Sequence, residues 1–212
     1  MSGYVRDAAA LARKDLLLEL RGRDTLPAMA LFVVAMLVAF RFALSGDDPD
    51  AAAGLLWLAI LFTALLGLGR AFVPEREQGV LDALVLAPCD RSAIWLAKLL
   101  ATLAFLLLVE LIALPVFALF FEGLDGATVA AVLLADIGIC AVGTLLAAMA
   151  VAGRARELLL PLLFLPLALP ILIGGVGATV AGEPARYLGF LALYDLIFAI
   201  LAWATFEYVV TE

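Results

Sequence analysis

The residue types that could do chemistry are concentrated in one segment, Pro74 to Lys98, of a chain that is 67% hydrophobic. The segment reads PEREQGVLDALVLAPCDRSAIWLAK and separates two long apolar runs. Its acidic residues follow Pro74 in what would be a first helical turn, where negative charge is favoured, and a short apolar stripe comes next. Such a stripe must bury against lipid headgroups or against a protein groove, so the segment is either a simple interfacial helix or, as we infer, a docking surface for another subunit. The docking interpretation selects Glu75, Arg76, Glu77, Gly79, Leu81, Leu84, Pro88, Arg91 and Lys98.

Several classes of catalytic site are excluded by residues that the sequence lacks. The chain has no histidine, which excludes a histidine-dependent triad, a histidine-ligated zinc site and bis-histidine haem within it. It has no G-x-x-x-x-G-K-[ST] motif, and Lys14 and Lys98 are its only lysines, so it cannot be its own P-loop ATPase. An intramembrane hydrolase would need a nucleophile–base pair, which is hard to build without histidine. We therefore expect a non-catalytic chain without a metal site, in which Cys89 and Cys140 form no disulfide.

Three acidic residues lie deep within the apolar runs, at Glu110, Asp136 and Asp195. An ionised acid in hydrocarbon costs about 2.5–3.5 kcal/mol or more, so these side chains should face the interior of a helical bundle, form pairs or carry a proton. If these acids are functional, they form a proton path or a polar lining for a substrate route. The structural reading is a protonated acid that hydrogen-bonds to a neighbouring helix.

The elements that must position these residues are membrane-spanning helices. Only 16% of the residues are charged and the mean hydropathy is +1.18, far from the composition of soluble domains. A helix needs about 20 apolar residues to cross a bilayer. Counted against that length, the sequence predicts an all-α integral membrane protein with a single permease domain. Its six predicted spans are about 26–44, 52–73, 93–121, 127–152, 158–173 and 187–208.

The fifth predicted span has the least regular sequence. Pro161, Pro166 and Pro170 interrupt it, and the stretch 173–182, IGGVGATVAG, is too rich in glycine to continue it as a regular helix. We therefore expect the helix to end near Ile173, and a re-entrant turn is one form that residues 173–182 could take.

Residues 4–22 predict an additional amphipathic helix that lies on the membrane surface. At about 100° per residue, its basic side chains share one arc and its apolar side chains lie opposite. This helix is either an ordinary basic anchor or an elbow that also touches the docking subunit. Asp90 or Ser92 is expected to cap the third span. Trp57 and Trp95 are expected at the two membrane interfaces.

The basic residues predict the orientation of the chain. If the spans alternate, eleven of the thirteen lysines and arginines lie on one side, and only Arg41 and Arg186 lie on the other. Basic residues accumulate on the cytoplasmic side of membrane proteins. Both termini should therefore be cytoplasmic, in the plasma membrane of a bacterium or archaeon.

A family resemblance rests on the polar segment and its neighbours. The order of acidic pair, glycine, two leucines, proline and lysine resembles the cytoplasmic coupling segment of type-2 ATP-binding-cassette permeases. With further matches in the second and fifth spans, the chain is similar to the CcmB family, which belongs to the haem exporter of cytochrome c maturation. The residues that carry these further matches are Gly54, Trp57, Arg70, Phe72, Pro166 and Pro170.

The resemblance implies a permease that works with other proteins. Its partners would be a cytoplasmic ATPase subunit that holds ATP and Mg²⁺, a haem-handling membrane protein and a periplasmic haem chaperone, whose haem-loaded form the complex releases. The complex would handle haem while this chain binds no cofactor, two copies could pair, and no nucleic acid is involved. The alternatives are an ATP-driven exporter of another lipid-like or drug-like substrate, and a proton-coupled secondary transporter.

Overall fold

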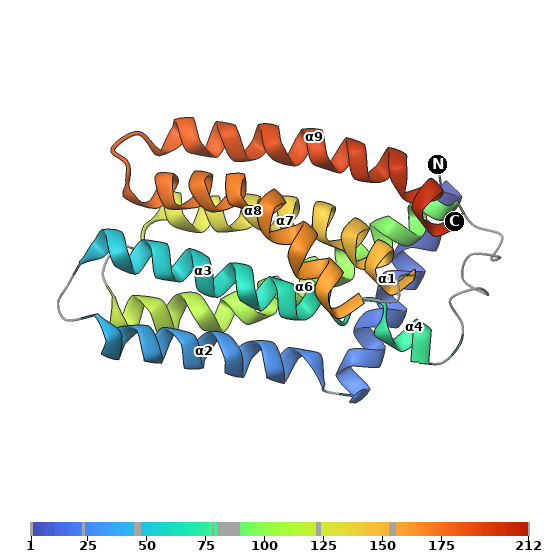
Figure 1. The fold of residues 1–212 in the computed structure, drawn as a ribbon, viewed down its shortest axis with the longest axis horizontal. Coiled ribbons are helices and arrows are strands. Elements are labelled where there is room, and N and C mark those ends of the chain that lie inside the picture. The colour runs from blue at the N-terminus through green and yellow to red at the C-terminus, as the bar shows by residue number, and fades with distance from the viewer. Residues whose placement is uncertain are drawn as a thin grey trace.

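The computed structural model describes residues 2–22, 24–44, 48–77, 79, 90–121, 124–152 and 156–211. These residues form helices and no strands, and six long helices lie side by side along one direction (Figure 1). They are α2 (Thr25–Ala43), α3 (Pro49–Leu68), α6 (Arg91–Phe120), α7 (Gly126–Ala152), α8 (Arg156–Val180) and α9 (Pro184–Thr211). The two other helices of the described ranges are α1 (Ser2–Gly22) and the short α4 (Val73–Glu77).

The six long helices have the length and composition of membrane spans. Each contains a window of 18 residues that is apolar enough to cross a bilayer, and the shortest, α2, has 19 residues, close to the number that a bilayer core requires. Large apolar side chains such as Leu111 of α6 and Leu193 of α9 lie on the outside of the bundle, as expected where lipid is the solvent. The prediction of an all-α membrane protein with six spans is confirmed.

Helix α8 differs from the prediction at its end. It continues without a break to Val180, so the expectation that the helix stops near Ile173 is wrong, and so is the re-entrant turn. The glycines do not loosen this helix because large side chains pack directly on them. A Cβ at Gly175 would lie 2.5 Å from the ring of Trp57, and a Cβ at Gly174 would lie 2.8 Å from Leu191. The three prolines also lie inside the helix, as membrane helices tolerate.

The two tryptophans that were expected at the interfaces lie inside the bundle instead. Trp57 is 1% exposed and Trp95 is 5% exposed, so this prediction is wrong. Each indole N–H finds an acceptor within the protein, the Thr179 hydroxyl at 3.0 Å for Trp57 and the Ala141 carbonyl at 3.3 Å for Trp95. A satisfied N–H removes the main reason for an indole to stay near water.

Helix α7 packs against four other spans, α3, α6, α8 and α9. Its small residues allow close approach, which is how helices associate in lipid. At Gly143 the side chain of Leu68 occupies the space that a Cβ would need, and at Gly138 the carboxyl of Asp195 does the same.

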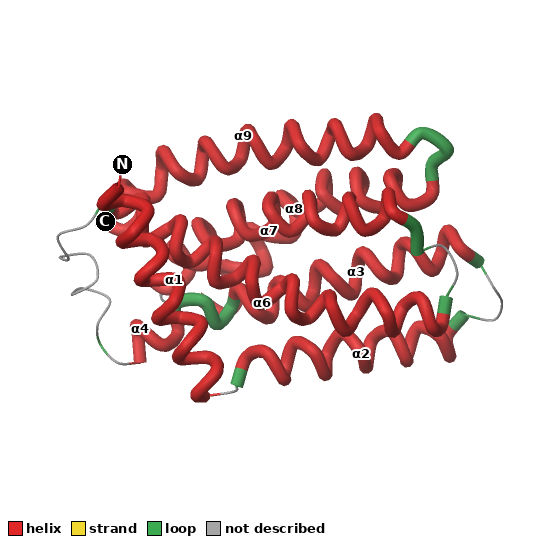
Figure 2. The backbone as a smooth tube through the Cα atoms, turned by 180° about the vertical axis from the view of Figure 1, so that it is seen from behind, coloured by secondary structure: helices red, strands yellow, loops and turns green. Residues whose placement is uncertain are grey.

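Both termini, α1 and α4 lie at one end of the bundle, which we call the terminal end (Figures 1 and 2). Helix α1 runs across this end and packs on α6, burying Ala8 and Ala12. The side chain of Glu19 stabilises the turn between α1 and α2. Its Oε1 accepts hydrogen bonds from the backbone N–H groups of Thr25 and Leu26, the first residues of α2, at 2.7 and 2.8 Å. The predicted cap of the third span is confirmed, since Asp90 accepts from the Ser92 N–H at 3.0 Å at the start of α6.

Candidate functional site

A cluster of four charged residues joins α1, α4 and α6 at the terminal end. Its centre is Lys98 of α6, which is 4% exposed. Three oxygens surround its ammonium Nζ, one for each proton that the group can donate. They are the Ala71 carbonyl at 2.7 Å, Glu75 Oε1 at 2.9 Å and Asp15 Oδ2 at 2.9 Å. The ring of Phe72 adds a cation–π contact, with its centroid 5.1 Å from Nζ.

Glu75 receives a second cation from α1. The Lys14 ammonium donates to Glu75 Oε1 and also pairs with Asp15 at 3.0 Å. Burial alone would lower the pKa of Lys14, but the hydrogen bond to Glu75 and the charge of Asp15 outweigh it, so this pKa is raised above its ordinary value. We call Lys14, Asp15, Glu75 and Lys98 the ion-pair cluster. It holds two positive and two negative groups, so its charges sum to zero.

The predicted docking residues fall into two groups around this cluster. Glu75 and Lys98 are brought together, and Glu75 is buried at 2% exposure rather than presented outward. Arg76, one residue further along α4, is exposed, and Gly79 adopts a positive φ of 66° that favours glycine. Arg91 pairs with Glu207 of α9 at 3.1 Å. Leu81, Leu84, Pro88 and the side chain of Glu77 lie outside the described residues.

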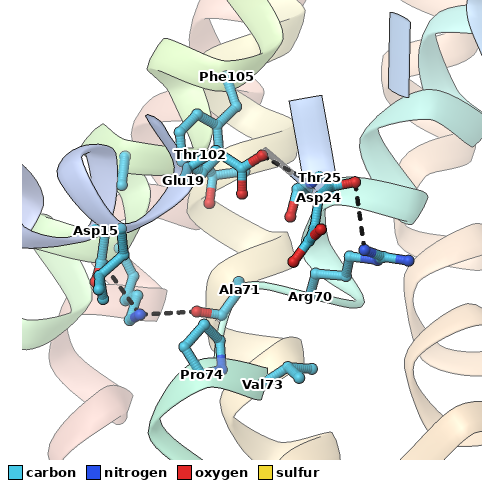
Figure 3. A pocket seen from close by; sticks show the side chains of 14 residues that line it. Asp15, Glu19, Asp24, Thr25, Arg70, Ala71, Val73, Pro74, Thr102 and Phe105 are labelled. Atoms are coloured by element: carbon cyan, nitrogen blue, oxygen red, sulfur yellow. Dashed lines mark hydrogen bonds and ion pairs between the residues drawn. The ribbon is translucent and has the colours of Figure 1, made fainter. Parts of the chain in front are cut away.

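A cavity of about 260 Å³ adjoins the ion-pair cluster. Figure 3 shows its polar lining, in which Asp15 and Glu19 come from α1 and Arg70 follows α3. Arg70 donates from Nη1 to the Asp24 carbonyl at 3.4 Å, next to the start of α2. Two acidic residues of α1, Asp15 and Glu19, therefore belong to the site, although neither was predicted from the sequence. The signal that could have indicated them is the polar side of the amphipathic helix itself.

The three intramembrane acids lie inside the bundle, as expected. Asp136 is 0% exposed, and Glu110 and Asp195 are nearly as buried. Both oxygens of Asp195 have no hydrogen-bond partner among the residues that the structure describes, whereas the carboxyls of Glu110 and Asp136 lie within hydrogen-bond reach of each other. The three acids come from the packed helices α6, α7 and α9. The described residues contain no group of three or more acids, cysteines or histidines suited to a metal ion.

The residues of the family resemblance have mainly packing roles in this fold. Trp57 bridges α3 and α8 through Thr179, and Phe72 lies beside Lys98. Pro166 and Pro170 lie within α8. Gly54 of α3 has no atom within 4 Å of the place that a Cβ would take, so close packing does not require its small size.

Comparison with known proteins gives one consistent result. The family model described as CcmB protein matches residues 6–208. Proteins named heme exporter protein B from several bacteria are similar to the chain. The one from Rhodobacter capsulatus is 36% identical over 172 residues, which cover 78% of this chain and 79% of the relative. The one from Bradyrhizobium diazoefficiens is 31% identical over 214 aligned positions, covering 92% and 95%. The one from Paracoccus denitrificans is 36% identical over 189 residues, covering 84% and 85%.

Proposed function

The chain belongs to the CcmB family, and on this premise we propose that it is the permease subunit of a haem exporter in the inner membrane, coupled to ATP hydrolysis by a separate cytoplasmic subunit. In this proposal the terminal end faces the cytoplasm and the opposite end faces the periplasm. There the complex, together with a haem-handling membrane partner, would release a haem-loaded chaperone.

The ion-pair cluster is the feature that supports coupling between ATP hydrolysis in the partner subunit and movement of the spans. The docking segment begins at α4, and Glu75 of α4 is held by Lys98 of α6 and by Lys14 of α1. A push on this segment is therefore expected to move α1 and α6 with it, because separating the buried charges of Glu75 and Lys98 would be costly. Both lysines of the chain are used in the cluster, which agrees with ATP hydrolysis in another polypeptide.

Co-purification with an untagged ATPase subunit tests the docking surface. Glu75 is unsuitable for this test, because its reversal would disrupt the ion-pair cluster. We expect Glu77→Lys combined with Leu84→Asp to lower the amount of co-purified ATPase at least tenfold while the protein still inserts into the membrane. Arg186→Glu, a charge reversal at an exposed site at the opposite end, is the matched control and should retain the ATPase. Unchanged co-purification of the double variant would refute docking on this segment.

Complementation tests whether the transporter serves haem export. In a bacterium that lacks its own haem exporter protein B, this chain expressed with its ATPase subunit should restore covalent haem in c-type cytochromes, as seen by haem staining. Changing the Walker lysine of the ATPase should abolish that restoration. A chain that binds the ATPase yet restores no haem staining would instead be an exporter of another lipid-like or drug-like substrate.

A second candidate, proton-coupled transport, is supported by the three acids buried among the spans, two of which, Glu110 and Asp136, lie within hydrogen-bond reach of each other. If these acids carry the driving protons, then Glu110→Gln, Asp136→Asn and Asp195→Asn should each abolish activity, and the Walker lysine of a partner should be dispensable. Full activity in all three variants would end this candidate.

A further inference from the structure

A second, larger hollow of about 660 Å³ lies on the outside of the bundle near the terminal end, within the size range of ligand sites. Its floor comes from α3 and α7, with Leu68 and Ala150 among the lining residues. Its sides come from Phe32 of α2 and from Leu160 and Pro161 of α8. We call it the α3–α8 groove. All four helices are membrane spans, so the groove lies in the membrane-spanning part of the bundle.

The groove extends over a large part of one leaflet of a bilayer. Its lining follows α3 from Phe62 to Leu68, which is about 9 Å of helix at 1.5 Å per residue, and continues through the turn that follows to Arg70. Half of the hydrocarbon core is about 15 Å. Phe62 is 39% exposed on the outer surface, so an acyl chain can enter from the side.

One charged side chain lines the groove, and it lies at the end nearest the membrane surface. Arg70 is exposed, and the hydrogen bond that the described residues give it is the long one to the Asp24 carbonyl. A guanidinium has five N–H donors in a planar fork that fits phosphate oxygens. Among the described residues Arg70 has that one partner, so most of its donors are available to a ligand whose apolar part fills the groove.

The chemistry of the lining favours a phospholipid over haem, although both are anionic amphiphiles. Haem would bring two carboxylates and an iron atom, and iron in proteins is held by histidine, cysteine, methionine or tyrosine. The described lining consists of phenylalanine, leucine, valine, alanine, glycine and proline besides Arg70, and none of these residues is an iron ligand. A phospholipid needs none.

We propose that the α3–α8 groove is a binding site for one anionic glycerophospholipid, with an acyl chain between Phe62 and Leu160 and the phosphate on Arg70. This site is independent of the proposed haem export, since it requires neither the ATPase nor haem.

Native mass spectrometry of the delipidated full-length chain tests the proposal, with phosphatidylglycerol and phosphatidylcholine of identical acyl chains as probes. We expect wild-type protein to retain one phosphatidylglycerol in preference to phosphatidylcholine. Arg70→Gln should lower that preference about tenfold, since it removes charge-assisted hydrogen bonds, and Arg70→Lys should keep part of it. Arg13→Gln, which removes one exposed charge from α1 at the same end, is the matched control and should change nothing.

Two further measurements locate the lipid. Gly69→Phe, whose Cβ would face Leu160 at 3.9 Å, should narrow the groove and reduce retention of both lipids. A photoactivatable phosphatidylglycerol should label peptides of α3 and α8 in unmodified protein. Equal retention of the two lipids by wild type, an unchanged preference in Arg70→Gln, labelling mainly on α6 and α9, or displacement of the lipid by added haem would each overturn the proposal.

Discussion

The Lys98 ammonium holds three segments of the chain together in a nearly water-free position. It is surrounded by as many oxygens as it has protons, and the ion-pair cluster around it carries no net charge. Burying two charges together gains little over apolar packing, but removing one partner is costly, because the other is left without compensation. The ion-pair cluster therefore fixes the relative positions of α1, α4 and α6 but contributes little net stability.

The first prediction concerns the ion-pair cluster. Lys98→Met keeps the length and apolar stem of the side chain but removes the charge, leaving Glu75 with Lys14 as its remaining cation. We expect the free energy of unfolding to fall by about 3 kcal/mol, the lower end of the range for a broken buried ion pair. Thermal unfolding in detergent, followed by the helical circular dichroism signal, measures it.

Two comparison variants separate the loss of charge from other effects. Arg91→Met breaks the exposed pair with Glu207 and should change stability by less than about 1 kcal/mol. Lys98→Met leaves two acids, Asp15 and Glu75, with the single cation Lys14, so adding Glu75→Gln removes the excess negative charge and should recover half of the loss or more. If the double variant is no more stable than the single one, the ion pair is not the cause of the loss.

The sequence indicated Glu75 and Lys98 as important but assigned them to an outward-facing surface. Their partners could not be predicted, because Lys14 and Glu75 are 61 positions apart and meet only when α1 lies across α6. The tryptophans follow the same logic. Trp57 would suit an interface by composition, but Thr179, 122 positions away, accepts its N–H and allows it to be buried.

Helix α8 shows how packing overrides local propensity. Glycines and prolines disfavour a helix when taken one by one, which is why the sequence predicted an end near Ile173. In the fold, Gly174, Gly175 and Gly177 accept the side chains of Leu191, Trp57 and Tyr187. The glycines are thus the surface against which α3 and α9 approach α8.

The second prediction follows from this surface. Gly175→Ala would place a Cβ 2.5 Å from the rigid, fully buried ring of Trp57. We expect a loss of about 2 kcal/mol from overpacking, seen as a lower thermal midpoint in detergent. Gly189→Ala in α9 is the matched control, because no atom lies within 4 Å of its Cβ, and it should be neutral or stabilising by up to about 1 kcal/mol. Equal midpoints for the two variants would show that α8 does not depend on this contact.

The six spans could be predicted because their signal is local. An apolar run of about 20 residues specifies a membrane helix whatever its neighbours are, and Asp90 caps α6 through a hydrogen bond only two residues along the chain. Which face of each helix is buried depends on the other helices. The arrangement of the bundle therefore did not follow from the sequence.

The third prediction concerns the orientation of the whole molecule. Both termini lie at the end that holds α1 and α4 (Figure 1). Helices α1 and α4 and the start of α6 carry seven of the thirteen lysines and arginines, and basic residues mark the cytoplasmic side. We expect green fluorescent protein fused after Glu212 to fluoresce in cells. Alkaline phosphatase inserted in the segment 45–47, directly after Gly46, should be active. The exchanged fusions, with phosphatase at the C-terminus and fluorescent protein at 45–47, should both be silent. Activity of the exchanged pair instead would reverse the orientation.

The positions of the tryptophans give the molecule an intrinsic optical reporter. Trp57 and Trp95 are enclosed by protein, whereas Trp203 of α9 is 53% exposed on the outer face. A quencher carried on lipid tails should therefore reach mainly the emission of Trp203, and the unquenched remainder comes from the α3–α8 and α6–α7 contacts. Any step of a transport cycle that separates α3 from α8 would then be visible as a change in that remainder, without a label attached to the protein.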